Sequence, residues 1–210
     1  MTKAIRQSIA IICILFSMAF CASSQADENS LYDSELAKVK ACDESSDFTK
    51  LRLLYSKTAK YNPYASDQKK SEEMYRAFNE GKFEEAVSYA NLILDKNYVD
   101  LDAHLLLTFA YQEIGNSERS GFHDFVVNGL LNSILASGDG ESPKTAFVVI
   151  TDKEEYAILQ LLELQADEQK LVNEDGHSYD VFKATDLKTG QSSVLYFNVD
   201  IPLGWLGKKI

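Results

Sequence analysis

The stretch that decides the fold opens with Gly-Lys-Phe-Glu-Glu-Ala at Gly81–Ala86 and closes with Gly-Asn-Ser-Glu-Arg-Ser at Gly115–Ser120. The two glycines are 34 residues apart, and between them lie two segments with helical periodicity, Phe83–Lys96 and Leu101–Ile114. Apolar residues of the first segment recur every three or four positions, as they do on the buried face of an amphipathic helix. The connection between the segments is short, which predicts that the two helices are antiparallel neighbours.

Four more segments are predicted to be helical, and they lie on both sides of this pair: Asp33–Cys42, Ser46–Thr58, Asp67–Glu80 and Ser117–Ala136. Ser46 or Asp47 can cap the second of them, and a glycine with positive φ, Gly81, is expected to end the third. The segment Lys60-Tyr-Asn-Pro-Tyr64 predicts a break, because the residue before a proline is pushed out of the helical region. We expect its tyrosines to pin this turn onto the first helices, with an aromatic contact surface as the alternative.

After Ser137-Gly-Asp-Gly140 the pattern changes from helical to mixed. The apolar run Ala146–Ile150 is typical of a buried strand, and Thr151-Asp-Lys-Glu154 is a capping box that opens a helix to about Leu164. Turn residues then separate three predicted strands, which together indicate an antiparallel β-meander: Gln169–Asn173, Ser178–Thr185 and Ser192–Val199.

The predicted fold class is therefore α+β, with an N-terminal antiparallel helical array packed on a small C-terminal α+β part. We expect a signal peptide at residues 1–26, the helical array at 27–137 and the small α+β domain at 138–210. Four strands and one helix make a small core, so the C-terminal part is expected to need the array for stability.

The helical part resembles tetratricopeptide repeats over about Asp67–Leu131, and the 34-residue spacing is the period of that family. The match rests on six glycine, aromatic and small or apolar positions: Gly81, Phe83, Ala86, Leu107, Tyr111 and Gly115. His104 stands where the family has a tryptophan, and Ser120 and Asp124 replace a small and an aromatic residue. The resemblance implies a concave surface that holds a peptide or partner helix. It would be lined by Tyr75, Phe78, Asn79, Leu105, Phe109 and Gln112.

The chain beyond residue 26 also resembles a bacterial family of exported proteins that is designated a domain of unknown function, number 4919. Six short segments carry this resemblance: Tyr61-Asn-Pro-Tyr64, Ala103-His104, Ser137-Gly-Asp-Gly140, Glu154-Glu-Tyr156, Gly176-His-Ser-Tyr-Asp180 and Tyr196-Phe-Asn-Val-Asp200. It implies the same architecture and brings no known activity.

The first residues have the three parts of a secretory signal peptide. Lys3 and Arg6 precede an apolar run, Ile9–Phe20, and the small and polar residues Ser24-Gln-Ala26 follow it. Twelve apolar residues form a helix of about 18 Å, too short for a hydrocarbon core of about 30 Å, so cleavage after Ala26 is favoured over a membrane anchor. A lipid on Cys21 is a further alternative. We expect an exported protein, periplasmic or secreted, with no membrane span after cleavage.

The chain carries 21 basic and 32 acidic residues, for a net charge of −11. This charge repels nucleic acid and anionic membrane surfaces, and neither is expected as a partner. Signal cleavage would leave Cys42 as the only cysteine, which rules out an intramolecular disulfide. We expect it to be a half-buried helix cysteine rather than a catalytic thiol.

Candidate chemistry is confined to a few histidines and aspartates. A catalytic or metal site needs several such groups to converge, and a possible polar cluster comprises His123, Asp139, His177 and Asp180. His104 occupies an inward position of a predicted helix and is expected to pack there. No zinc, calcium, dinucleotide or nucleophile-elbow motif is present, so no catalytic residue, metal or cofactor is assigned.

The leading functional hypothesis is an exported protein-interaction module that holds an unknown protein or peptide of the cell envelope. The alternatives are a hydrolase or metal-dependent enzyme that uses the polar cluster, or a purely structural envelope protein. Whether the four polar side chains converge in a cleft, or an aromatic groove stays open, distinguishes them.

Overall fold

The computed structural model describes residues 27–64 and 68–207, and the predicted signal peptide lies outside them. A helix at 27–40 is followed by α2 (Phe48–Tyr55) and by the four helices of the array. These are α3 (Gln68–Asn79), α4 (Phe83–Leu94), α5 (Leu101–Glu113) and α6 (Ser117–Leu135). The C-terminal part contains the short helix η1 (Pro143–Thr145), β1 (Phe147–Val148), α7 (Asp152–Leu161), β2 (Leu164–Glu174), β3 (His177–Asp186), β4 (Ser192–Asn198) and α8 (Asp200–Gly207).

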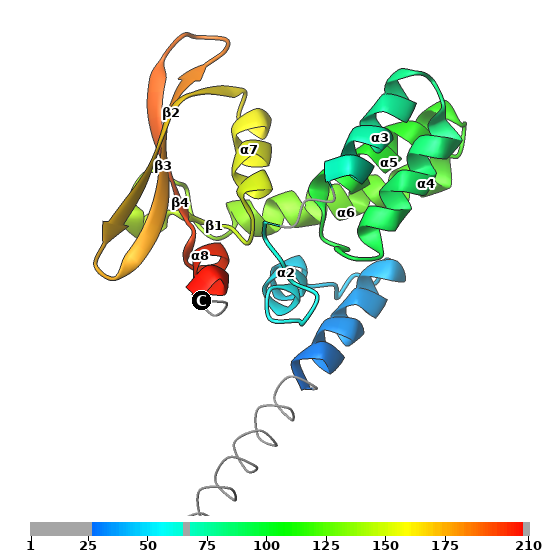
Figure 1. Cartoon of the computed structure of the whole chain (residues 1–210), viewed down its shortest axis with the longest axis horizontal. Coiled ribbons are helices and arrows are strands. Elements are labelled where there is room, and N and C mark those ends of the chain that lie inside the picture. The colour runs from blue at the N-terminus through cyan, green and yellow to red at the C-terminus, as the bar shows by residue number, and fades with distance from the viewer. Residues whose placement is uncertain (1–26, 65–67, 208–210) are drawn as a thin grey trace, which may run out of the picture.

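Consecutive helices of the array pack side by side, α3 on α4, α4 on α5 and α5 on α6 (Figure 1). Gly81 and Gly115 end α3 and α5 with φ of +73° and +80°, as expected of glycines that allow the chain to reverse. Asp100 caps α5 by accepting a hydrogen bond from the backbone N–H of Ala103, at 3.0 Å. Asn116 caps α6 in the same manner through Arg119, at 3.1 Å. The sequence therefore predicted the array closely.

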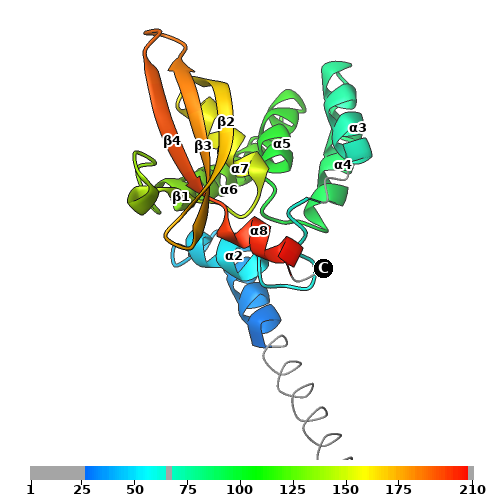
Figure 2. The same ribbon diagram turned by 60° about the vertical axis from the view of Figure 1, so that its left-hand side comes forward.

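The four strands form one sheet in the order β1-β4-β3-β2 (Figure 2). β2, β3 and β4 are the predicted antiparallel meander, and Asp175 and Gly176 form the first turn with φ of +51° and +85°. The sheet is not a pure meander, because β1 pairs with β4 in parallel, Phe147 opposite Phe197. The run from Ala146 to Ile150 thus supplies only a two-residue strand at one edge.

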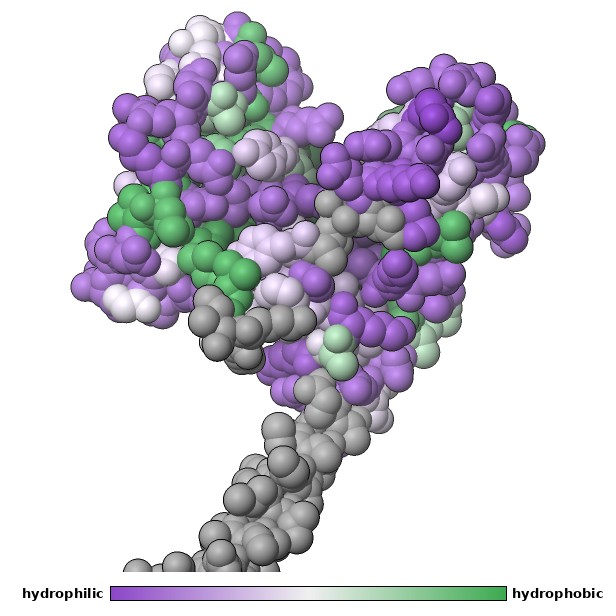
Figure 3. Space-filling view, viewed as in Figure 1, coloured by the Kyte–Doolittle hydropathy of each residue, from purple (hydrophilic) through white to green (hydrophobic). Residues whose placement is uncertain are grey.

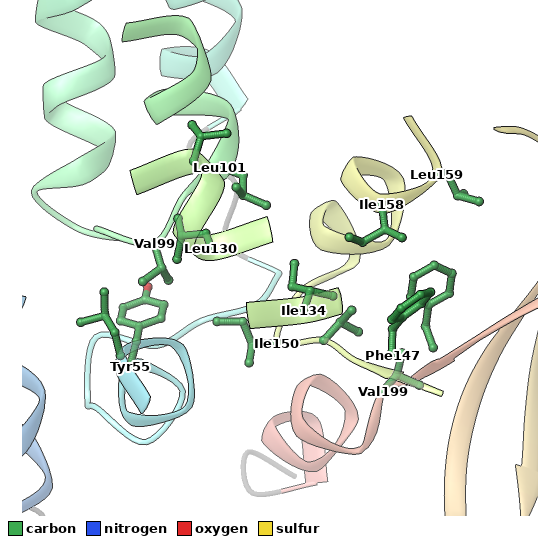
Figure 4. Close-up of a cluster of buried hydrophobic side chains, with 14 of the residues drawn as sticks. Tyr55, Val99, Leu101, Leu130, Ile134, Phe147, Ile150, Ile158, Leu159 and Val199 are labelled. Carbon is green, nitrogen blue, oxygen red and sulfur yellow. The ribbon is translucent and has the colours of Figure 1, made fainter. Parts of the chain in front are cut away.

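Two hydrophobic clusters hold the described residues together. The first contains Tyr32 and Leu51 from the N-terminal helices, Val126 and Ile134 from α6, and residues of α7 and the sheet. Figure 4 shows part of it, with Leu130 and Ile134 lying between Tyr55 on one side and Ile158 and Phe147 on the other. The second cluster lies within α3, α4 and α5. α6 packs against both the array and the C-terminal part. The domain boundary expected at residue 138 therefore stays a prediction, which depends on whether the two parts fold separately.

Other departures from the expected elements are local. β2 begins five residues earlier than expected, because it pairs with β3 along its whole length through a bulge between Ala166 and Glu168. α8 was not expected, and it lies across one end of the sheet (Figure 2). Cys42 is exposed and has a φ of +51°, so the expectation of a half-buried helix cysteine is wrong. It lies in the turn two residues after the end of the helix 27–40, with a positive φ that glycine or asparagine usually takes.

Candidate functional site

The six residues expected to line a concave surface lie on two helices. Tyr75, Phe78 and Asn79 are on α3, whereas Leu105, Phe109 and Gln112 are on α5. The exposed fractions of Leu105 and Phe109 are 39% and 49%, high values for apolar side chains on a helix that is otherwise deeply packed. Phe78 is half-buried and makes an edge-to-face contact with Phe83 of α4, so it belongs to the core of the array.

Leu105 lies where two cavities meet. A cavity of about 200 Å³ lies between α5, α6 and α7, and its lining is largely apolar: Leu101, Leu105, Val127, Leu131, Ala157 and Leu161. A second cavity of about 570 Å³ continues along α5 and α6, and Leu105, Phe109 and Gln112 line it together with Ser120 and Asp124. We call the two together the α5–α6–α7 groove.

The smaller cavity of the groove lies between the two lobes of the molecule, whereas the larger one is lined by α5, α6 and the connection between them. Figure 1 shows α7 on one side and the helices of the array on the other, with α6 crossing beneath them. The space-filling view has a notch between the two lobes (Figure 3). Leu105, Phe109 and Gln112 therefore lie in a groove, whereas Tyr75, Phe78 and Asn79 line neither of its cavities. The second wall comes from α7, whose Leu161 is 46% exposed and was not expected to take part.

His123 makes its polar contact with His104 rather than with the other residues of the predicted polar cluster. The two Nδ1 atoms are 2.9 Å apart, and Nε2 of His104 lies 2.8 Å from the carbonyl oxygen of Tyr98. Burial lowers the pKa of His104 to about 4. Burial and the neighbouring His104 lower the pKa of His123 to about 3. Both rings are therefore neutral at physiological pH, and the expected packing role of His104 is confirmed by its complete burial.

The remaining members of the predicted polar cluster each have other partners. Asp139 accepts a hydrogen bond from the backbone N–H of Glu141 at 2.9 Å, which shapes the turn after α6. Nδ1 of His177 lies 2.6 Å from Oδ2 of Asp200, at the start of α8. Asp180 accepts a hydrogen bond from the side chain of Gln169, at 2.9 Å. Among the residues that the structure describes, we find no contact between any two of the four.

A buried ion pair that the sequence did not reveal joins α2 to α7. Arg52 donates from Nε to Oε1 of Glu154 at 2.9 Å and from Nη2 to Oε2 at 2.6 Å. It also donates to the hydroxyl of Ser133 and to the carbonyl of Val148, both at 3.0 Å. The sequence predicts Glu154 to be the last residue of a capping box. In the structure its carboxylate instead accepts a hydrogen bond from the backbone N–H of Ile150, at 2.9 Å. One planar guanidinium thereby links α2, α6, β1 and α7.

The neighbouring Glu155 is buried as well, and it connects α7 to the sheet. Burial and the charge of Asp180 raise the pKa of Glu155 to about 9, so Glu155 is protonated at neutral pH. Its Oε2 is shut off from solvent and accepts no hydrogen bond, and a protonated Glu155 can instead donate to the carboxylate of Asp180. Burial also raises the pKa of Asp180. Glu155 and Asp180 therefore influence each other's pKa between α7 and β3.

The described part of the chain has neither a candidate metal cluster nor a candidate membrane-spanning helix. No group of three or more His, Cys, Asp or Glu side chains there is placed to hold a metal ion. No helix among residues 27–64 and 68–207 has both the length and the apolar character needed to cross a membrane.

The fold and the groove define a helical array joined to a small mixed sheet. The chain belongs to the family described as "Domain of unknown function (DUF4919)", whose match covers residues 24–205. This agrees with the resemblance found in the sequence. No curated protein and no solved structure matches the chain.

Proposed function

We propose that this protein is an exported interaction module that holds an amphipathic helical segment of a partner in the α5–α6–α7 groove. The observation that supports this most is the exposure of Leu105, Phe109 and Leu161 along one groove. Apolar side chains that gather in a concavity between lobes are typical of helix-binding surfaces. The apolar face of the partner segment would cover them.

The charges around the groove favour a basic partner. Asp102 lines one cavity of the groove and Asp124 lines the other, and the exposed Glu113 follows Gln112 at the end of α5. Asp102 has one basic neighbour, Lys153, whose Nζ lies 3.5 Å from its carboxylate. The net charge of −11 attracts basic segments over the whole surface. A segment with apolar residues on one face and Lys or Arg at its borders fits this rim.

Export is the second part of the proposal, and it rests on the signal-peptide pattern of the first 26 residues. It is tested by mass spectrometry of the protein recovered from its native host. The proposal expects an N-terminus at Asp27. Recovery of a protein that retains residues before Ala26, or that carries a lipid on Cys21, would contradict it.

Binding is tested by capture from the native envelope fraction, followed by calorimetry with the purified partner segment. Phe109→Ser and Leu161→Ser should each weaken that binding by about 2 kcal/mol, or about 30-fold, because aromatic and aliphatic anchors carry most of such interfaces. Leu187→Ser is the matched control, because Leu187 is 64% exposed in the turn between β3 and β4, outside the groove.

A charge reversal tests the chemistry of the partner. Asp124→Lys should weaken binding of a basic segment, and the loss should shrink at high salt because exposed charges are screened. If the control at Leu187 loses as much affinity as the two groove variants, or if Asp124→Lys strengthens binding, the groove does not hold a basic helix.

A further inference from the structure

A second concavity adjoins the α5–α6–α7 groove at Gly121 of α6, which lines both. It has a volume of about 760 Å³ and lies between helix 27–40, the end of α4 and the start of α6. This volume is within the range of cavities that take small ligands. We propose that this cavity binds a small aromatic carboxylate that also donates one hydrogen bond. The proposal is independent of the partner proposed for the groove.

The hydrogen-bond acceptor for this ligand is fixed by the histidine pair. The carbonyl oxygen of Tyr98 only accepts, so Nε2 of His104 carries the proton in their 2.8 Å contact. The neutral ring of His104 then has a lone pair on Nδ1, which must accept from Nδ1–H of His123 across 2.9 Å. His123 is neutral too, so its Nε2 carries no proton and is an acceptor.

The position of His123 makes that acceptor available. His123 lines the cavity, whereas His104 does not. Nε2 of His123 has no hydrogen-bond partner among the described residues. It is not one of the polar atoms that are shut off from solvent without a partner, so it is in contact with solvent. A lone pair held at the wall of a cavity in this way recognises an O–H or N–H group.

The charge and the rings of the cavity supply the rest of the specificity. Arg119 lies over the ring of Tyr111 at 5.3 Å and donates one hydrogen bond to its hydroxyl at 2.8 Å. Other N–H groups of its guanidinium remain for a ligand. The nearby carboxylate of Glu118 acts on Arg119 through its charge, but no salt bridge to Arg119 is seen among the described residues. Lys40 lies over Tyr98 at 4.9 Å, as a second cation at the same cavity.

Two aromatic side chains pack against the ring of His123, and other aromatic side chains line the cavity beside it. Tyr111 stacks on it with 9° between the planes, and Phe122 meets it edge-on. Tyr32 and Phe125 line the same space. The charged lining of the cavity is mixed, with four basic side chains and three acidic ones: Lys40, Lys60, Lys96 and Arg119 against Asp33, Asp95 and Glu118. The basic excess next to aromatic walls favours an anion with a flat apolar body at this place, against the net charge of −11 of the whole chain. The carboxylate would meet Arg119, the ring would lie among the aromatic side chains, and the donor would reach His123.

Calorimetry with matched probes tests each part of this recognition. Indole-3-acetate has the carboxylate, the ring and an N–H donor. Indole-3-acetamide lacks the charge, and 1-methylindole-3-acetate lacks the donor. Indole-3-acetate should bind at one site, and each analogue should bind at least about tenfold more weakly, as expected for the loss of one hydrogen bond to a charged or buried group. 4-Hydroxyphenylacetate and its O-methyl ether form a second matched pair.

Variants and nuclear magnetic resonance locate the site. Arg119→Gln should weaken indole-3-acetate about tenfold or more, whereas Lys188→Gln, an exposed cation outside this cavity, should not change it. Long-range proton–nitrogen spectra should show an unprotonated Nε2 in His123, whose resonance shifts with indole-3-acetate and not with the N-methyl analogue.

Three results would overturn the proposal. The first is the absence of saturable binding of both donor-bearing carboxylates at millimolar concentration. The second is binding that is unchanged in Arg119→Gln. The third is a His123 Nε2 resonance that is protonated, or that does not respond to a bound ligand.

Discussion

Replacing Arg52 with methionine should reduce the free energy of unfolding by about 3–5 kcal/mol, the cost of removing one partner from a buried ion pair. The side chains of Arg52 and Glu154 are only 1% and 3% exposed, so water cannot replace the lost guanidinium. Methionine replaces the arginine side chain only as far as Nε, so the loss combines the orphaned carboxylate with the space that the guanidinium group leaves. The carboxylate of Glu154 would keep only the hydrogen bond from Ile150 N–H.

The double variant Arg52→Met/Glu154→Leu separates the orphaned charge from the lost pair. It removes both charges, so it should be more stable than Arg52→Met alone, although it leaves the Ile150 N–H without its acceptor, at a cost of about 1–3 kcal/mol.

Urea unfolding measures these differences, followed by circular dichroism and by the emission of Trp205, the single tryptophan. Lys82→Met is the control, because Lys82 forms an exposed ion pair with Glu80 and its loss should leave stability nearly unchanged. If Arg52→Met costs no more than Lys82→Met, or if the double variant is the less stable of the two Arg52 variants, the buried pair is not what joins α2 to α7.

Three further predictions follow from burial and packing. Glu155→Gln should be increasingly more stable than the wild type as the pH rises from 4.5 towards 9, by up to about 1.4 kcal/mol per pH unit. The reason is that the raised pKa of the buried Glu155 lets the folded state keep a proton that the unfolded state has lost, and equal pH profiles in thermal melts would refute that raised pKa. The pKa values of His104 and His123 are lowered in the folded state, so the folded protein should lose stability as the pH drops below 6.5 towards about 4. A variant with both residues changed to glutamine should lack that part of the loss in urea titrations. The fragment 142–210 should be poorly folded, because α6 supplies the side chains that its helix and sheet pack on; a cooperative melt of the fragment would establish a second independent domain.

The sequence predicted the helical array well because its signals are local. Apolar periodicity, the caps at Asp100 and Asn116, and two glycines at helix ends each act within a few residues. Most helix boundaries consequently agree with the structure to within three residues. β2 was harder to predict because it is an edge strand that exposes most of its side chains, so hydrophobic alternation is weak there.

The candidate site depended on contacts that local patterns do not contain. Arg52 and Glu154 are 102 residues apart in the chain, and an arginine within the apolar segment Leu51–Leu54 was the one available signal. His104 and His123 lie at similar distances on either side of Gly115, which in an antiparallel helix pair places them at the same level. That symmetry would have predicted their contact, whereas nothing local indicates that α7 forms the second wall of the groove.

The central claim is that the α5–α6–α7 groove holds a basic amphipathic helix, and site-specific photo-crosslinking in the native host tests it most directly. A benzophenone amino acid would replace Phe109, Leu161 or, as the control, Leu187. The account predicts that the groove positions at Phe109 and Leu161 crosslink to the same segment of one partner, that the segment is amphipathic and carries Lys or Arg, and that Leu187 does not reach it. Crosslinks of equal yield from all three positions, or a partner segment that is acidic, would contradict the account.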